Sequence, residues 1–422
     1  MTNGFLHRLM DLIEAGKTPY HTVALCEKEL IKAGFLRLDE GEAWQLERGG
    51  RYYVVRDGSA MVAFSVGEKS GPFRIVASHT DSPCLKIKGD KPVCDANGYL
   101  KWNVERYGGP LLYSWLDIPL VLAGREVRYE PETGKLTATL VESEHKSVIP
   151  SLAIHFNRDA NSALSLNAQT DMQPVVSLFA SGYEGDPAVL GRDLFLVNAA
   201  SPYLAGAQDE LLVSPRLDNL VSVFTSLMAL AEAENDSGVS MILLADNEEV
   251  GSHTKQGADS DLLARTMSRV AQALLEDIDT LLCRSFLVSC DGAHAVHPNR
   301  PEKSDPANPV RLGGGVVIKH HAGQNYTTDG FSEAAIKAIL GKAKVPYQDF
   351  YMRADMPCGS TLGAISATQV SVRSVDIGIP QLAMHSATET AAAEDCLHLY
   401  RALSAFFAAD LCMSSYDTGV LG

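Results

Sequence analysis

The sequence predicts an α/β protein: a mostly parallel sheet, sandwiched by helices, that is interrupted by an inserted β-rich domain. Helix-like and strand-like segments alternate from residue 216 onward, and a buried strand of the same kind is predicted far upstream, at residues 71–81. Such alternation is typical of parallel sheets covered by helices. Between these parts, short β-like runs are separated by Gly, Pro and Asn turns. We therefore expect one α/β domain formed by residues 1–84 and 216–422, and an insert over residues 85–215.

The N-terminal part is expected to begin with two helices. In residues 1–17, apolar and acidic residues interleave at helical spacing, and no continuous apolar stretch leads to a small-residue cleavage site. This pattern predicts a helix and not a signal peptide. A second helix is expected at residues 22–34, with strands at residues 50–56 and 59–66. The stretch GPFRIVASHTD, residues 71–81, then has the character of a buried strand that ends in polar side chains.

The remaining elements follow from apolar periodicity and turn residues. In the insert, β-like runs cover residues 111–118, 120–129 and 135–141. After it we expect helices at residues 217–234, 259–275, 330–344, 359–370 and 388–409, and strands at residues 239–245, 285–291, 348–353 and 372–377.

Composition excludes several classes of protein. The 422 residues exceed the size at which a single core keeps growing, which favours two domains or one large domain with an insertion. A formal net charge of −16 disfavours nucleic acid and anionic membranes as partners, because both require a basic surface. The 8 cysteines show no C-x-x-C spacing and are expected to be reduced and buried, and no apolar run approaches the length of a membrane span. We expect a cytoplasmic enzyme or binding protein.

Acidic and histidine residues follow nearly every predicted strand of the α/β domain. Ligands gather at the carboxyl ends of the strands in such sheets, so these side chains are expected to share one edge. Taken singly, an acidic pair in a loop is usually solvated and a histidine at a strand end is usually structural. The residues concerned are His79 and Asp81 in ASHTDS, Asp218 in SPRLDNL, Glu248 and Glu249 in DNEEVGS, Asp291 in SCDGAHAVHP, and His385 in QLAMHSAT.

A cluster of this composition predicts a metal site. So many buried acids are costly unless cations neutralise them. Carboxylates with a minority of imidazoles and no thiolate suit Zn²⁺, Mn²⁺ or Co²⁺ in a hydrolytic site, and two ions about 3.5–4 Å apart could share one carboxylate. Asp81 can orient His79 from two residues away. Because adjacent side chains of an extended chain point apart, one of Glu248 and Glu249 can bind metal while the other handles protons.

The motifs HTD, PRLDN, DNEEVGS, SCDGAHAVHPN and QLAMHS, together with IPSLAIHF at residues 149–156, resemble the aspartyl aminopeptidase family of dinuclear zinc aminopeptidases. The resemblance runs through nearly the whole chain in the same order. It implies an aminopeptidase that removes N-terminal residues, preferably Asp or Glu, from short peptides by means of a metal-activated water. It further implies a catalytic α/β domain, a β-rich insert that serves as a lid and in oligomerisation, and dodecamers built from dimers.

The resemblance also implies roles for individual residues. Asp218 matches the carboxylate that bridges two divalent metal ions, with His79 and Asp291 completing the ligands of one ion and Glu249 and His385 those of the other. Glu248 matches the general base, Asp81 the histidine-orienting carboxylate, and His155 a histidine offered to a neighbouring subunit's active site. Zinc is the expected metal, with manganese and cobalt as alternatives. Residues 352–361 resemble a loop near the substrate, and the expected substrate-binding residues are Lys319, His294, Asp355, Gly359 and Ser360.

Other interpretations stay open at this point. The same ligands could serve a related dinuclear zinc hydrolase, such as a carboxypeptidase or a deacylase. The chain could also be a non-catalytic, metal-binding assembly protein. Lys319 could be a solvated lysine at a strand end, and His155 a structural histidine of the insert.

Overall fold

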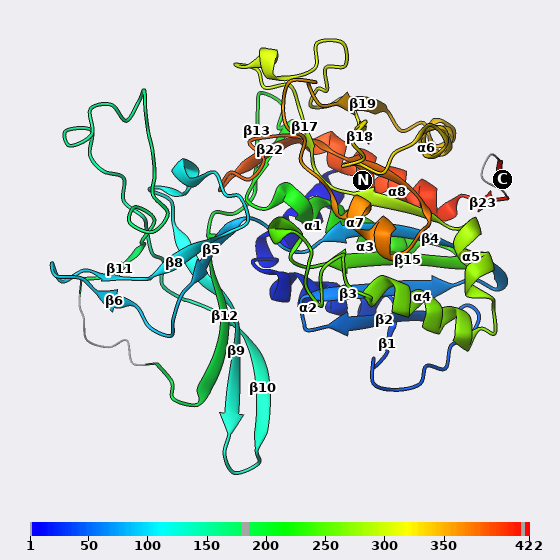
Figure 1. The fold of residues 1–422 in the computed structure, drawn as a ribbon, viewed down its shortest axis with the longest axis horizontal. Coiled ribbons are helices and arrows are strands. Elements are labelled where there is room, and N and C mark those ends of the chain that lie inside the picture. The colour runs from blue at the N-terminus through cyan, green and yellow to red at the C-terminus, as the bar shows by residue number, and fades with distance from the viewer. Residues whose placement is uncertain (1, 179–184, 415–417) are drawn as a thin grey trace.

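The molecule consists of an α/β lobe and a β-rich lobe (Figure 1). The computed structural model describes residues 2–178, 185–414 and 418–422. Met1, with which the first predicted helix begins, lies outside the described residues. The predicted fold class, a mostly parallel sheet between helices with a separate β-rich part, is confirmed.

A large mixed sheet forms the centre of the α/β lobe. The centre of the sheet is parallel, because β4 pairs in parallel with β15 on one side and with β16 on the other. The carboxyl ends of these three strands therefore lie at the same edge of the sheet. The strand order is β1 (Leu36–Arg37), β2 (Arg51–Arg56), β3 (Ala60–Val66), β15 (Ser237–Ala245), β4 (Lys69–His79), β16 (Phe286–Cys290), β20 (Arg373–Gly378), β18 (Val316–His320) and β19 (Tyr347–Tyr351).

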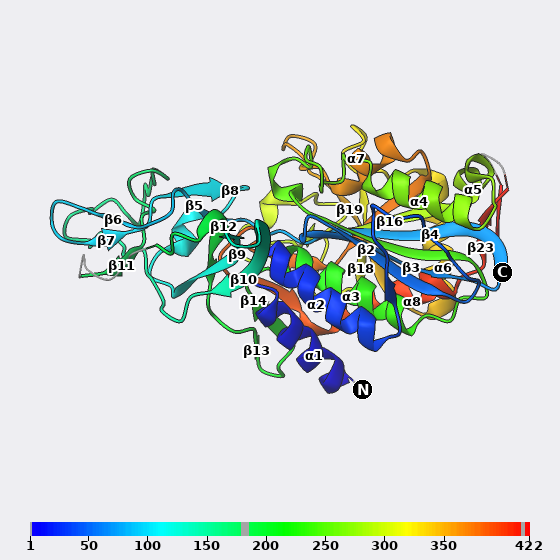
Figure 2. The ribbon, with the colours of Figure 1, turned by 90° about the horizontal axis from the view of Figure 1, so that it is seen from below.

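Helices cover both faces of this sheet (Figure 2). Neighbouring strand residues such as Leu243 and Leu244 belong to different hydrophobic cores, which explains why the central strands read as continuous apolar runs. No helix in the described ranges is long and apolar enough to span a membrane. One face carries α1 (Thr2–Ala15), α2 (Pro19–Lys32), α3 (Leu217–Glu232), α6 (Gly330–Ala343) and α8 (Ala393–Ala408), and the other carries α4 (Leu262–Ala273), α5 (Ile278–Arg284) and α7 (Leu362–Gln369).

The β-rich lobe is built on a five-stranded antiparallel sheet with its own core. Its order is β10 (Lys135–Glu142), β9 (Leu120–Glu130), β12 (Val189–Asn198), β5 (Cys84–Ile87) and β8 (Val104–Tyr107). A small sheet beside it contains β11 (Val175–Ser177), β7 (Leu100–Lys101) and β6 (Val93–Cys94).

A further antiparallel sheet joins segments from both predicted domains. β13 (Tyr203–Ala205) and β14 (Leu211–Ser214) lie within the range expected for the insert, yet β14 pairs with β22 (Glu389–Ala392) near the C-terminus. β21 (Pro380–Leu382) and β17 (Ala293–His294) complete that sheet, and β23 (Leu411–Met413) pairs with β24 (Gly419–Leu421). The chain thus returns from the β-rich lobe to the α/β lobe before residue 215.

Several predicted elements are wrong in position or type. Residues 111–118 form no strand and contain instead the 3-10 turn η1 (Leu112–Trp115). The second helix starts earlier than predicted, because Thr18 caps it and Pro19 suits its first turn. The last helix starts at Ala393, since the residues predicted as its first turn form β22. Helix α5 was not predicted.

Candidate active site

The predicted metal ligands meet at the carboxyl edge of the central strands. His79 is the last residue of β4, and Asp291 follows the end of β16. Asp218 lies in the first turn of α3. Glu249 belongs to the 3-10 turn η2 (Glu248–Val250) after β15, and His385 lies in the loop after β21. The folding of five separate segments to one edge therefore brings together side chains that are far apart in the sequence.

Asp218 lies between two groups of possible metal ligands. Its Oδ1 is 3.5 Å from His79 Nε2, and the same imidazole nitrogen is 3.4 Å from Asp291 Oδ1. Its Oδ2 is 3.6 Å from His385 Nε2, which in turn is 3.4 Å from Glu249 Oε2. One carboxylate thus offers a different oxygen to each trio, His79–Asp218–Asp291 and Asp218–Glu249–His385, whose ligand atoms lie close enough to surround an ion.

The residues present fit a pair of divalent cations. Asp218 Oδ1 and Glu249 Oε1 are buried and have no hydrogen-bond partner among the described residues. Burial, followed by the charge of Asp218, raises the pKa of Glu249 well above its ordinary value. Burial alone would lower the pKa of His79, but the carboxylates of Asp218, Asp291 and Asp81 outweigh it and raise that pKa. Buried acceptors without donors, made only of carboxylate and imidazole, are what zinc-like ions require.

Asp81 organises the first trio and the glutamate pair together. Its carboxylate lies 3.3 Å from His79 Nδ1, on the opposite side of the ring from the candidate metal position. It also accepts hydrogen bonds from the backbone N–H groups of Glu248 and Glu249, both at 3.1 Å. This buried carboxylate therefore fixes the imidazole and the glutamate turn with one group.

Two residues that sequence reasoning missed extend this network. Tyr107, the last residue of β8, donates its hydroxyl to Asp81 Oδ2 at 2.8 Å. The same hydroxyl accepts a hydrogen bond from Asn247 Nδ2 at 2.8 Å. Tyr107 lies in none of the sequence motifs, whereas Asn247 belongs to DNEEVGS but was given no role. Through Tyr107 the β-rich lobe contacts Asp81 and Asn247, beside the turn that carries Glu248 and Glu249.

A third missed residue is Glu389, whose only sequence signal is its place four positions after His385. Its buried carboxylate accepts hydrogen bonds from the backbone N–H groups of Asp218, at 2.9 Å, and His385, at 2.8 Å. Burial and the charge of Asp218 raise the pKa of Glu389 to about 8. Glu389 therefore contacts two of the three backbone segments that supply ligands to the second trio.

A cavity of about 320 Å³ opens over the cluster and is lined by all five candidate ligands and Glu248. Burial raises the pKa of Glu248 to about 8, with the charges of Asp291 and Asp81 adding to the rise. Of the expected substrate-binding residues, Lys319, His294, Gly359 and Ser360 line this cavity. Asp355 does not line it, and its exposed carboxylate pairs with Arg353.

Lys319 is a buried residue of β18, not a solvated lysine. Its ammonium donates hydrogen bonds to the backbone oxygens of Asp291 and Gly292, both at 3.1 Å. It also lies 3.8 Å from Asp291 Oδ2. Lys319 therefore places a positive charge at the cavity wall and holds the strand end that carries Asp291.

His155 lies far from this cluster, on an exposed segment of the β-rich lobe. Its neighbours Leu152, Ile154 and Phe156 are exposed as well, and the side chain of Phe156 is 80% accessible. Exposed apolar residues gathered in one segment are typical of protein contact surfaces. Within one chain, His155 does not line the catalytic cavity.

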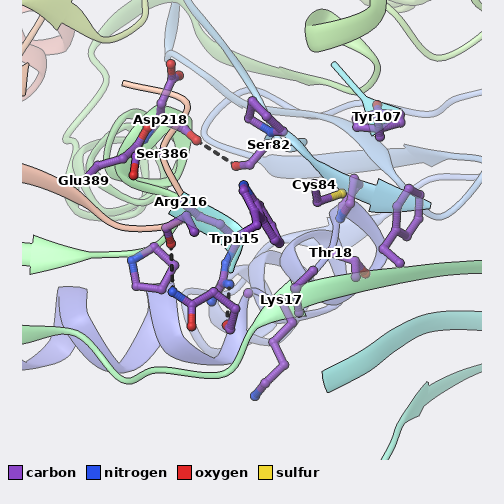
Figure 3. Close-up of a pocket in the computed structure, with 18 of the residues that line it drawn as sticks. Lys17, Thr18, Ser82, Cys84, Tyr107, Trp115, Arg216, Asp218, Ser386 and Glu389 are labelled. Atoms are coloured by element: carbon purple, nitrogen blue, oxygen red, sulfur yellow. Dashed lines mark hydrogen bonds between the residues drawn. The ribbon is translucent and has the colours of Figure 1, made fainter. Parts of the chain in front are cut away.

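A second, narrower cavity lies between the lobes, and Asp218 lines both cavities (Figure 3). Its other walls come from the loop after α1, from strands of the β-rich lobe and from Arg216, Ser386 and Glu389. Ser82 donates a hydrogen bond to the backbone oxygen of Asp218 at 2.6 Å in this region. Asp218 is thus supported from the side of the second cavity.

Comparisons with known proteins identify the family of the chain. Residues 12–188 and 186–407 match the family model described as Aminopeptidase I zinc metalloprotease (M18). A "probable M18 family aminopeptidase 2" of Clostridium novyi (strain NT) is 40% identical over 419 residues, covering 94% of this chain and 96% of that protein.

Solved structures share the fold over almost the whole chain. A chain in the cryo-EM structure of the Ape4 and Nbr1 complex is 34% identical, with a TM-score of 0.90, covering 96% of this chain and 86% of that one. A chain of the mApe1 dodecamer of S. cerevisiae is 25% identical, with a TM-score of 0.83 and 96% of both chains covered.

These matches confirm the resemblance predicted from the motifs. The relatives are aminopeptidases, so the alternatives of a carboxypeptidase, a deacylase or a non-catalytic assembly protein find no support among them. The chain therefore belongs to the M18 family of aminopeptidase I zinc metalloproteases, and it is a metalloaminopeptidase that hydrolyses peptide bonds.

Proposed function

We propose that the enzyme holds two divalent metal ions, preferably zinc, and removes Asp or Glu from the N-terminus of short peptides. The observation that carries the two-metal proposal is the position of Asp218, which presents Oδ1 to His79 and Oδ2 to His385. In this proposal His79, Asp218 and Asp291 hold one ion, and Asp218, Glu249 and His385 hold the other. Manganese and cobalt suit the same ligands.

Glu248 is the proposed general base. The metal pair, when bound, supplies positive charge that makes a water more acidic and a peptide carbonyl more electrophilic. Glu248 lines the cavity and lies outside the two trios that share Asp218, although its carboxylate is also close to His79 and Glu249. In this proposal it binds no metal and is left for proton transfer. It takes a proton from the attacking water and delivers it to the leaving amine. Asp81 supports this role by holding the backbone of Glu248.

The proposed acidic preference rests on Lys319. Among the described residues that line the catalytic cavity, Lys319 is the only lysine or arginine. A buried ammonium in a cavity wall favours a carboxylate side chain in the substrate. His294, Gly359 and Ser360 are proposed to contact the substrate because they line the same cavity. The role expected for Asp355 would require the loop that carries it to move.

A substrate panel tests this function. The purified protein is analysed for bound metal and then assayed with Asp-, Glu-, Leu- and Lys-anilides, with and without a chelator. We expect about two metal ions per chain, loss of activity with chelator, and the fastest cleavage of the Asp and Glu substrates. N-acetylation of a good peptide substrate should abolish cleavage. Activity that survives complete metal removal would contradict the two-metal proposal, and faster cleavage of Leu would remove Lys319 from substrate selection.

We further propose that residues 85–215 act as a lid and in assembly, that chains form a dodecamer built from dimers, and that the enzyme works in the cytoplasm. Support for assembly comes from the exposed apolar segment around His155 and from the dodecamer formed by the mApe1 relative. In this assembly His155 completes the active site of a neighbouring subunit. Support for the compartment comes from the cysteines, all of which are free. The expectation that they are all buried is wrong, because Cys94 and Cys283 are exposed.

A further inference from the structure

Glu389 contacts the second half of the metal cluster from behind. It is the first residue of β22, where it pairs with Ser214 of β14, and it is 1% exposed. It lines the narrow second cavity together with Asp218, but it does not line the catalytic cavity (Figure 3). A carboxylate in this place has no access to the substrate and acts only through the residues it contacts.

The hydrogen bonds of Glu389 join two ligand-bearing segments. One oxygen, Oε2, accepts from the backbone N–H of Asp218, and the other, Oε1, accepts from that of His385. Asp218 lies in the first turn of α3 and His385 lies in a loop. The strands that precede them, β14 and β21, both pair with β22, and Glu389 of β22 bonds the two ligand backbones directly. With both oxygens engaged, the carboxylate acts as a bidentate clamp between them.

The same arrangement occurs once more in the site, at Asp81. There the two carboxylate oxygens accept from the backbone N–H groups of Glu248 and Glu249. The two clamps divide the cluster between them: Asp81 holds His79 and the glutamate turn, and Glu389 holds Asp218 and His385. A buried carboxylate so close to other acids is unfavourable in itself, so its position calls for a role that offsets this cost.

We propose that Glu389 is a positioning residue that sets the spacing of Asp218 and His385 for the second metal ion. This inference rests on the two-metal function proposed above. Two of the three second-site ligands, Asp218 and His385, depend on Glu389. The first site depends on it only through Asp218, because Asp81 contacts His79 and Lys319 donates to the backbone of Asp291. Loss of the clamp should therefore weaken the second site selectively.

The test is a stepwise metal titration of the Glu389→Gln variant of the full chain. The amide keeps the size of the side chain but must turn an N–H₂ group toward one backbone N–H, which breaks one of the two bonds. Metal-free protein is titrated with Co²⁺ in competition with a chelator, while the visible absorption of the bound cobalt reports the geometry of each site. The matched control is Glu394→Gln, the same change at an exposed glutamate in the first turn of α8.

We expect the second equivalent of Co²⁺ to bind about 10–100-fold more weakly in Glu389→Gln, with an altered absorption spectrum, while the first equivalent and the control stay close to wild type. Equal affinity and an unchanged spectrum at both sites would overturn the proposal. If wild-type protein binds fewer than two ions, the two-metal function fails instead, and the two failures are thereby distinguished. If Glu389→Gln does not fold by circular dichroism, Glu389→Asp decides: it keeps the charge but is too short for both bonds, and it should show the same selective loss.

Discussion

At the scale of single residues, the proposed division of labour between Glu248 and Glu249 is open to direct test. A Glu248→Gln variant keeps the side-chain shape and removes proton transfer. Because Glu248 is not among the proposed ligands, the variant should still bind two ions while kcat falls about 10²–10⁴-fold. Metal analysis alongside single-substrate kinetics measures both. Wild-type turnover by a variant that holds both ions would remove Glu248 from the mechanism.

Lys319 combines two tasks that substrate comparison can separate. Its ammonium holds the backbone of Asp291 and Gly292 and also places charge at the cavity wall. In Lys319→Met, kcat/KM should fall for every substrate, because the end of β16 loses its donor. It should fall about tenfold further or more for Glu-anilide than for Leu-anilide, since only the acidic substrate also loses a charged partner. The Leu substrate is the internal control: an equal loss for both would leave Lys319 with the positioning task alone.

Asp246 predicts how stability depends on pH. Burial, with the charge of Asp81, raises its pKa from 3.8 to about 7 in the folded protein. Between these values the folded chain binds a proton that the unfolded chain does not, so stability falls as pH rises from about 4 to about 7. Asp246→Asn removes this titration. As pH rises, the free energy of unfolding of the variant should therefore increase relative to that of wild type, by up to about 1.4 kcal/mol per pH unit. Urea unfolding of both metal-free proteins at pH 5 and pH 7 measures the difference. The same change in free energy of unfolding between the two pH values for both proteins would contradict a raised pKa of Asp246.

At the scale of elements, the end of β8 supports the catalytic turn of the other lobe. Tyr107→Phe removes the hydroxyl that joins Asp81 to Asn247, so that Asn247 Nδ2 loses its acceptor and Asp81 Oδ2 keeps only the backbone N–H of Glu249. The expected cost is about 1–3 kcal/mol in the free energy of unfolding, together with a lower kcat because the backbone of Glu248 is less firmly held. Tyr113→Phe, the same change at an exposed tyrosine of η1, is the control. Identical behaviour of the two variants would show that the contact between β8 and the turn is unimportant.

The elements also show what sequence can predict here. The central strands were predictable because burial on both faces makes them continuous apolar runs, and His79, Asp218 and Asp291 were predictable because strand and helix ends carry polar residues. Glu389 was assigned to a helix, although its pairing with Ser214 places it in a strand. Neither Tyr107 nor Glu389 could be assigned a role, since each acts through contacts with residues far away in the chain. Long-range pairing of this kind leaves no local periodicity.

At the scale of the whole molecule, assembly is the remaining question, and the exposed apolar segment around His155 bears on it. If this segment is a contact surface, Phe156→Asp should place a charge in the interface and reduce the assembly to smaller species in light scattering. The control is Leu275→Ser, which alters a leucine that is 94% exposed on the α/β lobe and should leave the mass unchanged. An unchanged mass for Phe156→Asp would exclude this segment from the interface.

His155 itself should behave differently from Phe156, because the proposal gives it a catalytic place and not a packing role. His155→Ala should keep the mass of the assembly and lose most of its kcat. Complementation between two variants makes the test sharper. Assemblies of His155→Ala chains alone, or of Glu248→Gln chains alone, should be inactive. When the two kinds of chain are dissociated, mixed and reassembled, some active sites combine the intact Glu248 of one chain with the intact His155 of its neighbour. Recovered activity would require that the two residues act from different chains. If instead His155→Ala is fully active, or if mixing restores nothing, each active site is complete within one chain and the assembly serves another purpose.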